Sequence, residues 1–600
     1  MRVADYIAQS LARHGVKHVF LVTGGGAMHL NDAFGRSPQL QYVCCHHEQA
    51  CAMAAESYYR IHNRLAAVNV TTGPGGTNAI TGVYGAYVDS MGMIVVSGQV
   101  KYETVVRSTG LPLRQLGDQE VDIVKLVESV TKYAVMVTEP TSIRYHLERA
   151  LYLATHGRPG PVWLDVPMNV QSAHVDPESL RGYDPAEDEL HLDTRELPRV
   201  AAQIRDKLMQ AKRPVIYAGT GVRLSGAHAD FLRLVDQLGV PVVTAWNSHD
   251  LIWNEHPLYV GRPGTVGDRA GNFAVQNADF LLVLGCRLNI RLVSYNWKSF
   301  ARAAYKVIVD IDPSELKKPT VQPDLAVHAD VADVMRELLA LPVTRPNTEH
   351  ASWLAWCQER RVRYPVVLPE YWEGSEAVNP YCFADALFKE LPENEIVVTG
   401  DGTACVTTFQ AAFIRKGQRL YTNSGCASMG YDLPAAIGAC FAADKARVVC
   451  IAGDGSIQMN LQELQTIVTH KLPIKIFILN NRGYHSIRQT QQNYFSDNIV
   501  GCGTESGLGF PDFEKLAYAY GIPYRCIGSH AGMSEAISAT LTGQGPQICE
   551  VVLDLKQDFA PKLTSRRLPD GSIVSPPLED LAPFLDRDEL ARNMLIPKPQ

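Results

Sequence analysis

Two short polar segments carry residue types that suit a hard cation and a phosphate group. Residues 453–456 (Gly-Asp-Gly-Ser) directly follow the apolar run 448–451, and Asn480-Asn481 directly follow the apolar run 474–479. Both runs are predicted to be strands of one open parallel sheet, where ligands bind at the carboxyl ends of strands. Asp454 and Asn481 are therefore expected to converge at one edge of that sheet.

The oxygen-bearing groups of these segments match the preferences of Mg²⁺, which is usually shared between protein oxygens and the phosphates of a ligand. The predicted metal ligands are the Asp454 carboxylate, the Asn481 amide oxygen and the Gly483 carbonyl. The amides of Gly455 and Ser456, at the start of a helix, are predicted to receive phosphate oxygens. A plain strand–turn–helix with an aspartate cap would explain residues 453–456 alone, but the second polar segment favours the metal site.

Taken together, residues 453–455 and Asn480-Asn481 resemble the thiamin diphosphate motif of the acetolactate synthase and pyruvate decarboxylase family. The resemblance implies thiamin diphosphate held with Mg²⁺, with Tyr484 beside the cofactor. It also assigns Glu48, within His46-His47-Glu48-Gln49-Ala50, as the carboxylate that bonds the aminopyrimidine ring and promotes loss of the thiazolium proton. The alternative for Glu48 is a glutamate favoured by the helix dipole at a helix N-terminus.

Further segments fit the same resemblance. Residues 424–430 are similar to the loop that bends the cofactor, with the Ala427 carbonyl and the Met429 side chain as contacts. Met429 could instead be an ordinary gap-filling core residue. The first domain is expected to contribute cofactor contacts through Gly73, Pro74, Asn78 and Gln99. Candidates for proton handling, besides Glu48, are His47, Gln119 and His485.

Two substitutions in the predicted substrate pocket distinguish this chain from acetolactate synthases. Asp118 stands where the family has a phenylalanine, and Thr490 stands where the family has a tryptophan that selects the acceptor. Replacing tryptophan by threonine removes a large apolar wall, so a larger or more polar acceptor is expected. The surrounding residues 483–491 look like those of carboligases of the YerE type, which add an acetyl unit to a nucleotide-linked keto sugar.

The middle of the chain carries a weak dinucleotide signature. Gly219-Thr220-Gly221 lacks the third glycine of the usual fingerprint. Later segments are similar to those that hold FAD in acetolactate synthases, and the predicted FAD contacts are Gly219, Gly221, Gly285, Arg287, Asp310 and Glu315. In those enzymes FAD performs no net redox chemistry, and the alternative is an empty domain as in pyruvate decarboxylases.

The resemblance implies decarboxylation of pyruvate or a similar 2-oxo acid and carboligation of the acyl unit to a second carbonyl acceptor, a ketone or a keto sugar. Acetolactate synthase acting on two pyruvates and a simple decarboxylase are the alternatives within this chemistry. A nicotinamide-type redox enzyme and a non-catalytic homologue are less well supported, because the third glycine is missing and Glu48, Asp454 and Asn481 are present. The family's shared active site implies a homodimer or homotetramer.

The elements that must position these residues alternate between apolar runs, glycine-containing turns and helical patterns, which predicts an α/β fold of three doubly wound parallel-sheet domains. We expect a pyrimidine-binding domain at 1–171, a central domain at 196–342 and a diphosphate-binding domain at 380–556, joined by linkers at 172–195 and 343–379. Residues 557–600 are predicted to be a surface tail, either solvated or able to close over the site through Lys562, Arg566 and Arg567.

Composition excludes several other classes of protein. The net charge of −7 argues against a nucleic-acid partner, and no apolar run is long enough to cross a membrane. The first twenty residues lack the features of a secretion signal. Thirteen cysteines without paired spacing fit reduced thiols, so a cytoplasmic location is expected.

Overall fold

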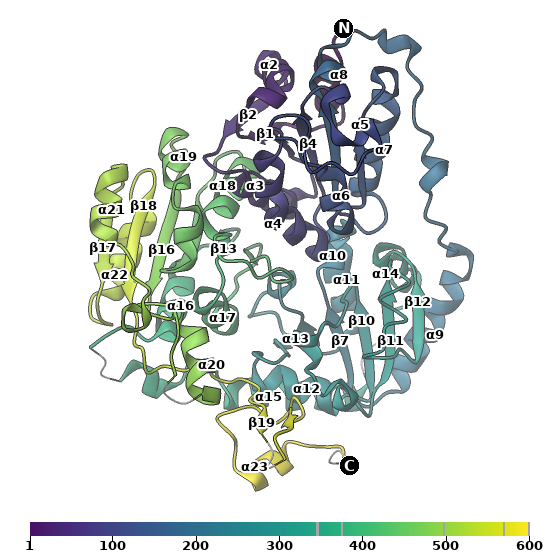
Figure 1. Ribbon diagram of the computed structural model, residues 1–600. Coiled ribbons are helices and arrows are strands. Elements are labelled where there is room, and N and C mark those ends of the chain that lie inside the picture. Colours follow the sequence, from purple (N-terminus) through teal and green to yellow (C-terminus); the bar gives the residue numbers. More distant parts are fainter. Residues whose placement is uncertain (344–346, 374–375, 496–497, 568–569, 598–600) are drawn as a thin grey trace.

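The chain forms three six-stranded parallel sheets covered by helices, so the predicted fold class is confirmed (Figure 1). This computed structural model describes all residues except 344–346, 374–375, 496–497, 568–569 and 598–600, and it leaves the side chains of Arg566 and Arg567 undescribed. Each sheet lies within one of the three predicted domain segments. The strands at the centres of the sheets are buried on both faces, which explains why they read as continuous apolar runs.

The first domain is built on a sheet of order β2-β1-β3-β4-β6-β5. Its strands are β1 (His18–Leu21), β2 (Gln41–Cys44), β3 (Ala67–Val70), β4 (Met93–Gln99), β5 (Tyr133–Met136) and β6 (Pro161–Pro167). Its helices are α1 (Val3–Arg13), α2 (Met28–Arg36), α3 (Glu48–His62), α4 (Pro74–Asp89), α5 (Val106–Thr109), α6 (Ile123–Val127), α7 (Ile143–Thr155) and α8 (Met168–Ser172). A long connection of short turns then leads down the side of the molecule to the second domain (Figure 1).

The central domain has the order β12-β11-β10-β7-β8-β9. Its strands are β7 (Pro214–Ala218), β8 (Val242–Thr244), β9 (Tyr259–Gly261), β10 (Phe280–Leu284), β11 (Tyr305–Asp310) and β12 (Leu325–His328). Its helices are α9 (Leu197–Gln210), α10 (Gly221–Leu224), α11 (His228–Leu238), α12 (Arg269–Asn277), α13 (Ile290–Val293) and α14 (Val331–Ala340).

The third domain has the order β14-β13-β15-β16-β18-β17. Its strands are β13 (Ile396–Thr399), β14 (Arg419–Tyr421), β15 (Val448–Gly453), β16 (Ile474–Asn480), β17 (Tyr524–Ile527) and β18 (Gln547–Val552). Its helices are α16 (Pro380–Glu390), α17 (Thr403–Ala411), α18 (Asp432–Ala442), α19 (Glu463–Thr469), α20 (His485–Phe495), α21 (Phe513–Tyr520) and α22 (Met533–Thr542). The first and third domains meet along α3 and α18, where Ser57 of α3 donates a hydrogen bond to the Ala435 carbonyl of α18 at 2.7 Å.

The second predicted linker differs from its expected form, because it contains a 16-residue helix. Helix α15 (Thr348–Arg363) packs against the central domain, with His350, Trp353 and Cys357 buried. The Trp353 indole donates to the Pro214 carbonyl at 3.1 Å. These three residues form a narrow buried stripe on an otherwise charged helix, so the polar composition concealed the helical pattern.

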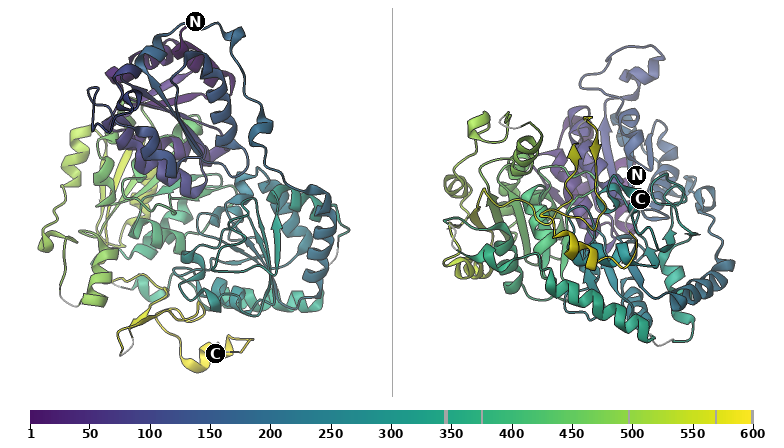
Figure 2. Two further views of the ribbon diagram at one scale, coloured as in Figure 1. Left: turned by 45° about the vertical axis from the view of Figure 1, so that its right-hand side comes forward. Right: turned by 90° about the horizontal axis from the view of Figure 1, so that it is seen from below.

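The C-terminal tail is held against the central domain. It contains β19 (Arg566–Arg567), β20 (Ile573–Val574) and α23 (Arg587–Arg592), and it runs beneath the molecule in Figure 2. Helix α12 anchors it with side chains: Asn272 donates to the Leu578 carbonyl at 2.9 Å and Gln276 donates to Glu579 at 2.6 Å. The prediction of a solvated surface arm is therefore wrong for these residues, because the tail contributes buried contacts such as Leu578 and Leu581.

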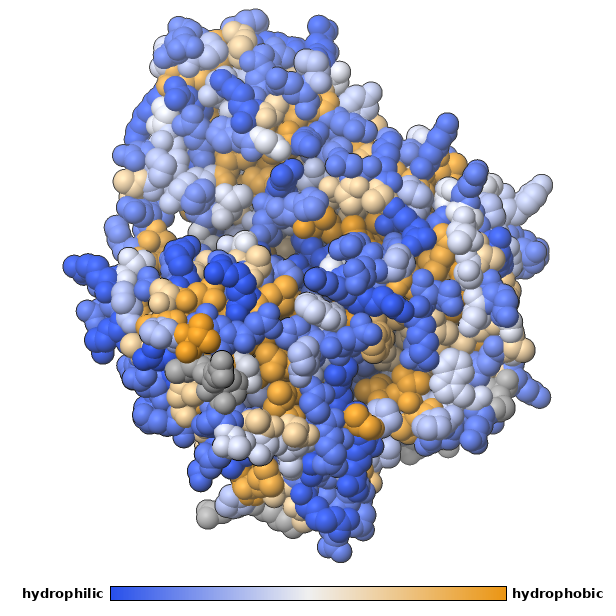
Figure 3. Space-filling view, turned by 180° about the vertical axis from the view of Figure 1, so that it is seen from behind, coloured by the Kyte–Doolittle hydropathy of each residue, from blue (hydrophilic) through white to orange (hydrophobic). Residues whose placement is uncertain are grey.

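The surface is mainly hydrophilic, with separate hydrophobic patches on the face seen from behind (Figure 3). Among the described residues, no helix has both the length and the apolar content that a membrane crossing requires.

Candidate functional site

A pocket lies at the carboxyl edge of the third sheet, where sequence reasoning expected a metal and a phosphate group. Strand β15 pairs with β13 on one side and β16 on the other, so the turns that follow these three strands meet. The pocket encloses about 750 Å³ of open space. Its lining includes the predicted residues Ala427, Met429, Asp454, Gly455, Ser456, Asn481, Gly483, Tyr484 and His485.

Asp454 and Asn481 both line this pocket with buried side-chain oxygens. The Asp454 carboxylate is buried and accepts hydrogen bonds from the Gly455 amide at 2.8 Å and the Gly483 amide at 2.9 Å. Burial raises the pKa of Asp454 to about 7. The Asn481 side chain donates to the Thr403 hydroxyl at 2.9 Å, while its amide oxygen is buried without a partner. A buried acceptor without a donor is costly, and a cation at this oxygen would remove that cost.

The donor set favours Mg²⁺ over a transition metal. In the described part of the chain, no group of three histidine, cysteine, aspartate or glutamate side chains could hold a metal ion. One carboxylate, one amide oxygen and backbone oxygens, completed by ligand phosphates, make the environment that Mg²⁺ accepts. The Gly483 carbonyl, a predicted ligand, already accepts a hydrogen bond from the His485 amide at 3.0 Å.

Close packing explains why glycines occupy two positions in this pocket. A Cβ at Gly483 would lie 1.7 Å from the Cys502 carbonyl oxygen, and the residue has a φ of +139°. A Cβ at Gly455 would lie 2.1 Å from the ring of Tyr484. The ring of Tyr484 therefore covers the turn whose amides are predicted to receive phosphate oxygens.

The loop before α18 forms another wall of the pocket. Ala427 is in the left-handed region with a φ of +52°, and Met429 is half-buried. The Ser456 hydroxyl donates to Asp432 at 2.6 Å and accepts from the Gly430 amide at 2.9 Å. Both hydrogen bonds of that hydroxyl are made within the protein. This agrees with the expectation that Ser456 would contact a phosphate through its backbone amide.

Asp401, Gly402 and Thr403 also line the pocket, and the sequence analysis missed them. They follow β13 directly, just as Asp454 follows β15. The signal was available in the sequence, because residues 400–403 (Gly-Asp-Gly-Thr) follow the apolar run 396–399. Applying the strand-end rule to this third strand would have found them.

Glu48 lies at a different place, at the first position of α3 in the first domain. It is 8% exposed, and its carboxylate accepts a hydrogen bond from Asn78 at 3.0 Å. His47 caps the same helix, because its Nδ1 accepts from the Gln49 amide at 3.1 Å. The structure therefore brings together Glu48 and Asn78 and gives His47 a structural task.

Two further predicted segments of the first domain, residues 73–74 and 118–119, contact each other. Gly73 has a φ of +65°, and a Cβ there would lie 2.0 Å from the Gln119 carbonyl oxygen, so the 118–119 turn rests on the Gly73-Pro74 segment. The side chains of Asp118 and Gln119 are both exposed.

Gln99 departs from its predicted contact with the cofactor. Its side chain is 1% exposed and donates to Asp165 and to the Val121 carbonyl, both at 3.1 Å. Its own carbonyl oxygen accepts from the Val100 amide at 3.0 Å. The amide of Gln99 is thus committed to the sheet, where it supports a buried carboxyl whose pKa burial raises to about 7.

Helix α20 carries two further predicted residues, His485 and Thr490. The Nε2 atom of His485 lies 3.1 Å from the Gln557 carbonyl oxygen, and its Nδ1 atom is buried without a partner. Thr490 is exposed and donates to the Ser486 carbonyl at 2.9 Å. Since residues three and four apart share a helix face, Thr490 continues the face whose first turn, Ser486 and Ile487, lines the pocket.

Comparison with known proteins covers the whole of this architecture. Residues 1–126, 201–338 and 394–551 match the N-terminal TPP binding, central and C-terminal TPP binding domains of thiamine pyrophosphate enzymes. The acetolactate synthase large subunit of Pyropia yezoensis is 32% identical over 561 residues, which is 91% of each chain. The probable acetolactate synthase large subunit of Methanocaldococcus jannaschii is 32% identical over 572 residues, 92% of each chain.

The chain belongs to the acetolactate synthase family of thiamine pyrophosphate enzymes. Thiamin diphosphate, the same compound as thiamine pyrophosphate, is its cofactor. Within one copy of this enzyme, the pocket around Asp454 is lined only by residues of the third domain among those described. Glu48 and its neighbours, which belong to the first domain, do not line this pocket.

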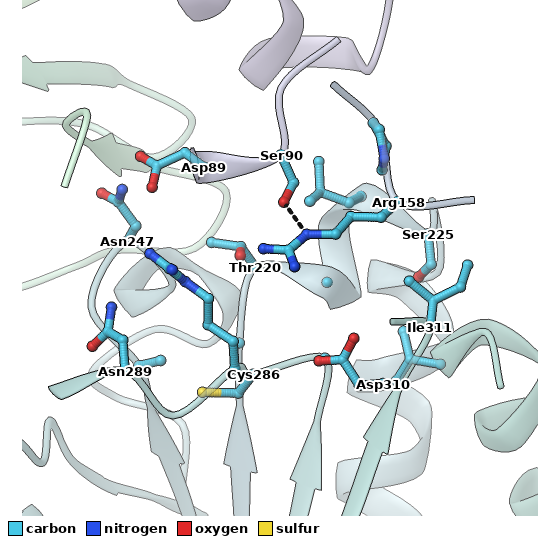
Figure 4. A pocket seen from close by; sticks show the side chains of 18 of the residues that line it. Asp89, Ser90, Arg158, Thr220, Ser225, Asn247, Cys286, Asn289, Asp310 and Ile311 are labelled. Atoms are coloured by element: carbon cyan, nitrogen blue, oxygen red, sulfur yellow. Dashed lines mark hydrogen bonds between the residues drawn. The ribbon is translucent and has the colours of Figure 1, made fainter. Parts of the chain in front are cut away.

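A second cavity of the enzyme lies where the three domains meet, and it encloses about 950 Å³. Figure 4 shows Asp89 and Asn247 at one end and Arg158, Asp310 and Ile311 at the other. The predicted residues Gly219, Gly221, Gly285, Arg287 and Asp310 line it. Burial raises the pKa of Asp310 to about 6.

Glu315 does not line this cavity. Its carboxylate is paired with Arg158 at 3.1 Å and with Lys318 at 2.9 Å. Arg158, which does line the cavity, also donates to Ser90 at 2.8 Å, the contact drawn in Figure 4. The structure therefore does not support the predicted contact of Glu315 with FAD, because the Glu315 carboxylate is paired with these cations and lies outside the cavity lining.

Proposed function

We propose that this enzyme decarboxylates pyruvate, or a similar 2-oxo acid, and transfers the acyl unit to a second carbonyl compound. The observation that carries the proposal is the pair of half-sites: an oxygen-lined pocket at Asp454 and Asn481, and a buried carboxylate at Glu48. Bound thiamin diphosphate supplies the electron sink that such a decarboxylation needs. The relatives quoted above are named acetolactate synthases, and that name supports pyruvate as the donor.

The third domain would hold Mg²⁺ and the diphosphate. Asp454, Asn481 and the Gly483 carbonyl are the proposed metal ligands, and the unpartnered Asn481 oxygen supports this assignment. The amides of Gly455 and Ser456 would bind phosphate oxygens. A cation beside Asp454 would also favour the ionised carboxylate, which burial alone disfavours.

Glu48 would hold a proton at the ring nitrogen of the cofactor's aminopyrimidine. Asn78 fixes the Glu48 carboxylate in advance, so little ordering is needed when the cofactor binds. Since one copy keeps the two half-sites apart, we propose that the first domain of one copy faces the third domain of another. Apolar side chains exposed on the single chain near both half-sites support a dimer: Tyr84, Tyr87, Leu111, Leu113, Leu116 and Met459.

The cavity between the domains would hold FAD as a structural group. Its elongated lining, with glycine turns after β7 and β10, supports a dinucleotide. Asp310 stands at the end of β11, where an acidic residue can accept hydrogen bonds from ribose hydroxyls. The thirteen free cysteines support a reducing compartment such as the cytoplasm.

Two acceptors are compatible with this function, and different observations favour each of them. Thr490 and Asp118 favour an acceptor that is larger or more polar than pyruvate, such as a ketone or a nucleotide-linked keto sugar. The acetolactate synthase relatives favour a second pyruvate.

Incubation of the purified protein with thiamin diphosphate, Mg²⁺, pyruvate and a panel of carbonyl acceptors tests the proposal. We expect release of CO₂ that chelation of Mg²⁺ abolishes, and mass spectrometry of the products identifies the acceptor. Acetolactate from pyruvate alone at the highest rate would select the acetolactate synthase version. Absence of CO₂ release from pyruvate and related 2-oxo acids would overturn the proposal.

A further inference from the structure

The start of the C-terminal tail is fixed in place next to α20. Hydrogen bonds join its backbone to three other parts of the molecule, and their heavy-atom distances are 2.7–2.9 Å. The contacts are Ala560 amide to Tyr381 hydroxyl, Gln410 side chain to Pro561 carbonyl, Lys562 amide to Ala582 carbonyl, and Leu563 amide to Thr265 carbonyl. A side chain carried by this segment therefore has a defined position.

Leu563 packs against the apolar core shared by the central and third domains. Its neighbours in the chain, Lys562 and Thr564, are half-buried. The Lys562 ammonium donates to the Gln489 oxygen at 3.4 Å, and Lys562 makes no ion pair with a described residue. The Thr564 hydroxyl is buried without a partner.

Gln489 links this ammonium to the pocket. Its side-chain nitrogen lies 2.8 Å from Nε2 of His485, and His485 lines the pocket of the proposed metal site. His485 is 5% exposed, and its Nδ1 atom has no partner. A half-buried cation, a buried glutamine and a buried histidine with one unpartnered nitrogen therefore form a line of contacts from the tail to the pocket. Such unsatisfied groups are expected where a ligand completes the hydrogen bonds.

We propose that Lys562 is a specificity residue that binds the anionic group, a carboxylate or a phosphate, of the acceptor. The inference rests on the proposed carboligation and adds the class of acceptor. An ammonium held without a counter-ion gains a charge-assisted hydrogen bond when an anion arrives. Gln489, which contacts the ammonium, would direct that anion toward α20, and Thr490 leaves space for the rest of the acceptor.

The substitution Lys562→Met tests this assignment in the full-length holoenzyme. The acceptors are dihydroxyacetone phosphate and 2-oxobutanoate, which are anionic, and dihydroxyacetone, which is neutral; pyruvate is the labelled donor. We expect the KM for an anionic acceptor to rise about 10- to 100-fold, the value of a hydrogen bond to a charged group. The KM for dihydroxyacetone should be unchanged. A rise for one anionic acceptor only would identify its group as the one bound.

Two controls separate this role from a structural one. Lys556→Met removes an exposed lysine just before the tail and should leave every KM unchanged. Lys562→Gln keeps a polar side chain, so it provides a second test should the methionine variant fail to fold. Equal losses with neutral and anionic acceptors, or a wild type that uses dihydroxyacetone as well as the anions, would overturn the proposal. CO₂ release from pyruvate is measured alongside, and its absence in the wild type would instead contradict the proposed function.

Discussion

The Glu48 carboxylate is already held in place without the cofactor, because Asn78 donates a hydrogen bond to it and only 8% of the residue is exposed. This fixed position suits its proposed role of holding a proton at the aminopyrimidine ring. The substitution Glu48→Gln keeps an acceptor for Asn78 and removes the ability to hold a proton. We expect CO₂ release to fall about 10²- to 10⁴-fold, the range for loss of a general acid or base. Steady-state CO₂ release at saturating thiamin diphosphate is the measurement.

The matched control for this experiment is Glu390→Gln, an isosteric change at an exposed position on α16. It should leave the rate and the thermal midpoint at their wild-type values. A Glu48→Gln enzyme that retains the wild-type rate would remove Glu48 from the chemistry.

At the residue scale, the position of a side chain could be predicted where the residue directly follows a strand. The prediction failed where the hydrogen-bond partner of the side chain lies on a different strand. Asp454 and Asn481 lie in one pocket because neighbouring parallel strands end at the same edge. Gln99 was misassigned because its partner Asp165 belongs to β6, and the pairing of β4 with β6 cannot be read from residues near Gln99. The orphaned Asn481 oxygen could be recognised only in three dimensions.

At the element scale, Asp165 connects β6 to β4 and makes stability depend on pH. Ser97 and Gln99 of β4 donate to its carboxyl, and burial raises its pKa to about 7, well above the value of about 3.9 expected in the unfolded chain. The folded state therefore binds the proton more tightly. This stabilisation is complete below about pH 4 and is lost as the pH rises toward 7, with a slope of about 1.4 kcal/mol per pH unit.

The substitution Asp165→Asn should remove this contribution to the slope. Thermal midpoints measured between pH 4 and 8 should fall less steeply in Asp165→Asn than in the wild type. Asp206→Asn, at an exposed position on α9, should keep the wild-type slope. Identical slopes for the wild type and Asp165→Asn would show that this carboxyl titrates normally.

Gly219 tests how the turns after β7 and β10 shape the central cavity. A Cβ at this position would lie 2.3 Å from the Gly285 carbonyl oxygen and 2.5 Å from the Cys286 Cα, and backbone atoms cannot move aside cheaply. Gly219→Ala should therefore destabilise the protein by roughly 1–3 kcal/mol and reduce the FAD that co-purifies. Thermal denaturation and the flavin absorbance band measure the two effects.

Gly35→Ala is the control, because it should not lower the stability of the protein. Gly35 lies within α2, and nothing lies within 4 Å of its added Cβ. Alanine is the better helix former by about 1 kcal/mol, so this variant should be as stable as the wild type or more stable. A Gly219→Ala protein as stable as Gly35→Ala would contradict the close approach of the two turns.

Element prediction from the sequence was reliable for strands and weaker for helices with few buried residues. The predicted strand 474–479 matches β16 (Ile474–Asn480) except for the last residue, because a central parallel strand is apolar over most of its length. Helix α15 was read as a linker because only three of its residues are buried. The sequence left the tail between a solvated arm and a closure over the site, because its contacts are with α12, which lies far earlier in the sequence.

At the scale of the whole molecule, the three-domain division was predictable from the rhythm of strands and turns, whereas the assembly of the active site was not. One copy presents Glu48 in its first domain and the Asp454 pocket in its third domain, with no described residue of the first domain lining that pocket. A sequence of one chain contains no direct signal for which copy supplies each half. We propose that the two halves of each site come from two copies of the chain.

Mixing two inactive variants tests that claim most directly. Glu48→Gln and Asp454→Asn are each expected to abolish CO₂ release, and co-expressed chains would form mixed dimers. In a mixed dimer, one site combines both substitutions and the other has neither, so random mixing should restore about a quarter of the wild-type rate. Activity at that level is the predicted result. A mixture that stays as inactive as its two components would show that each copy builds its site alone.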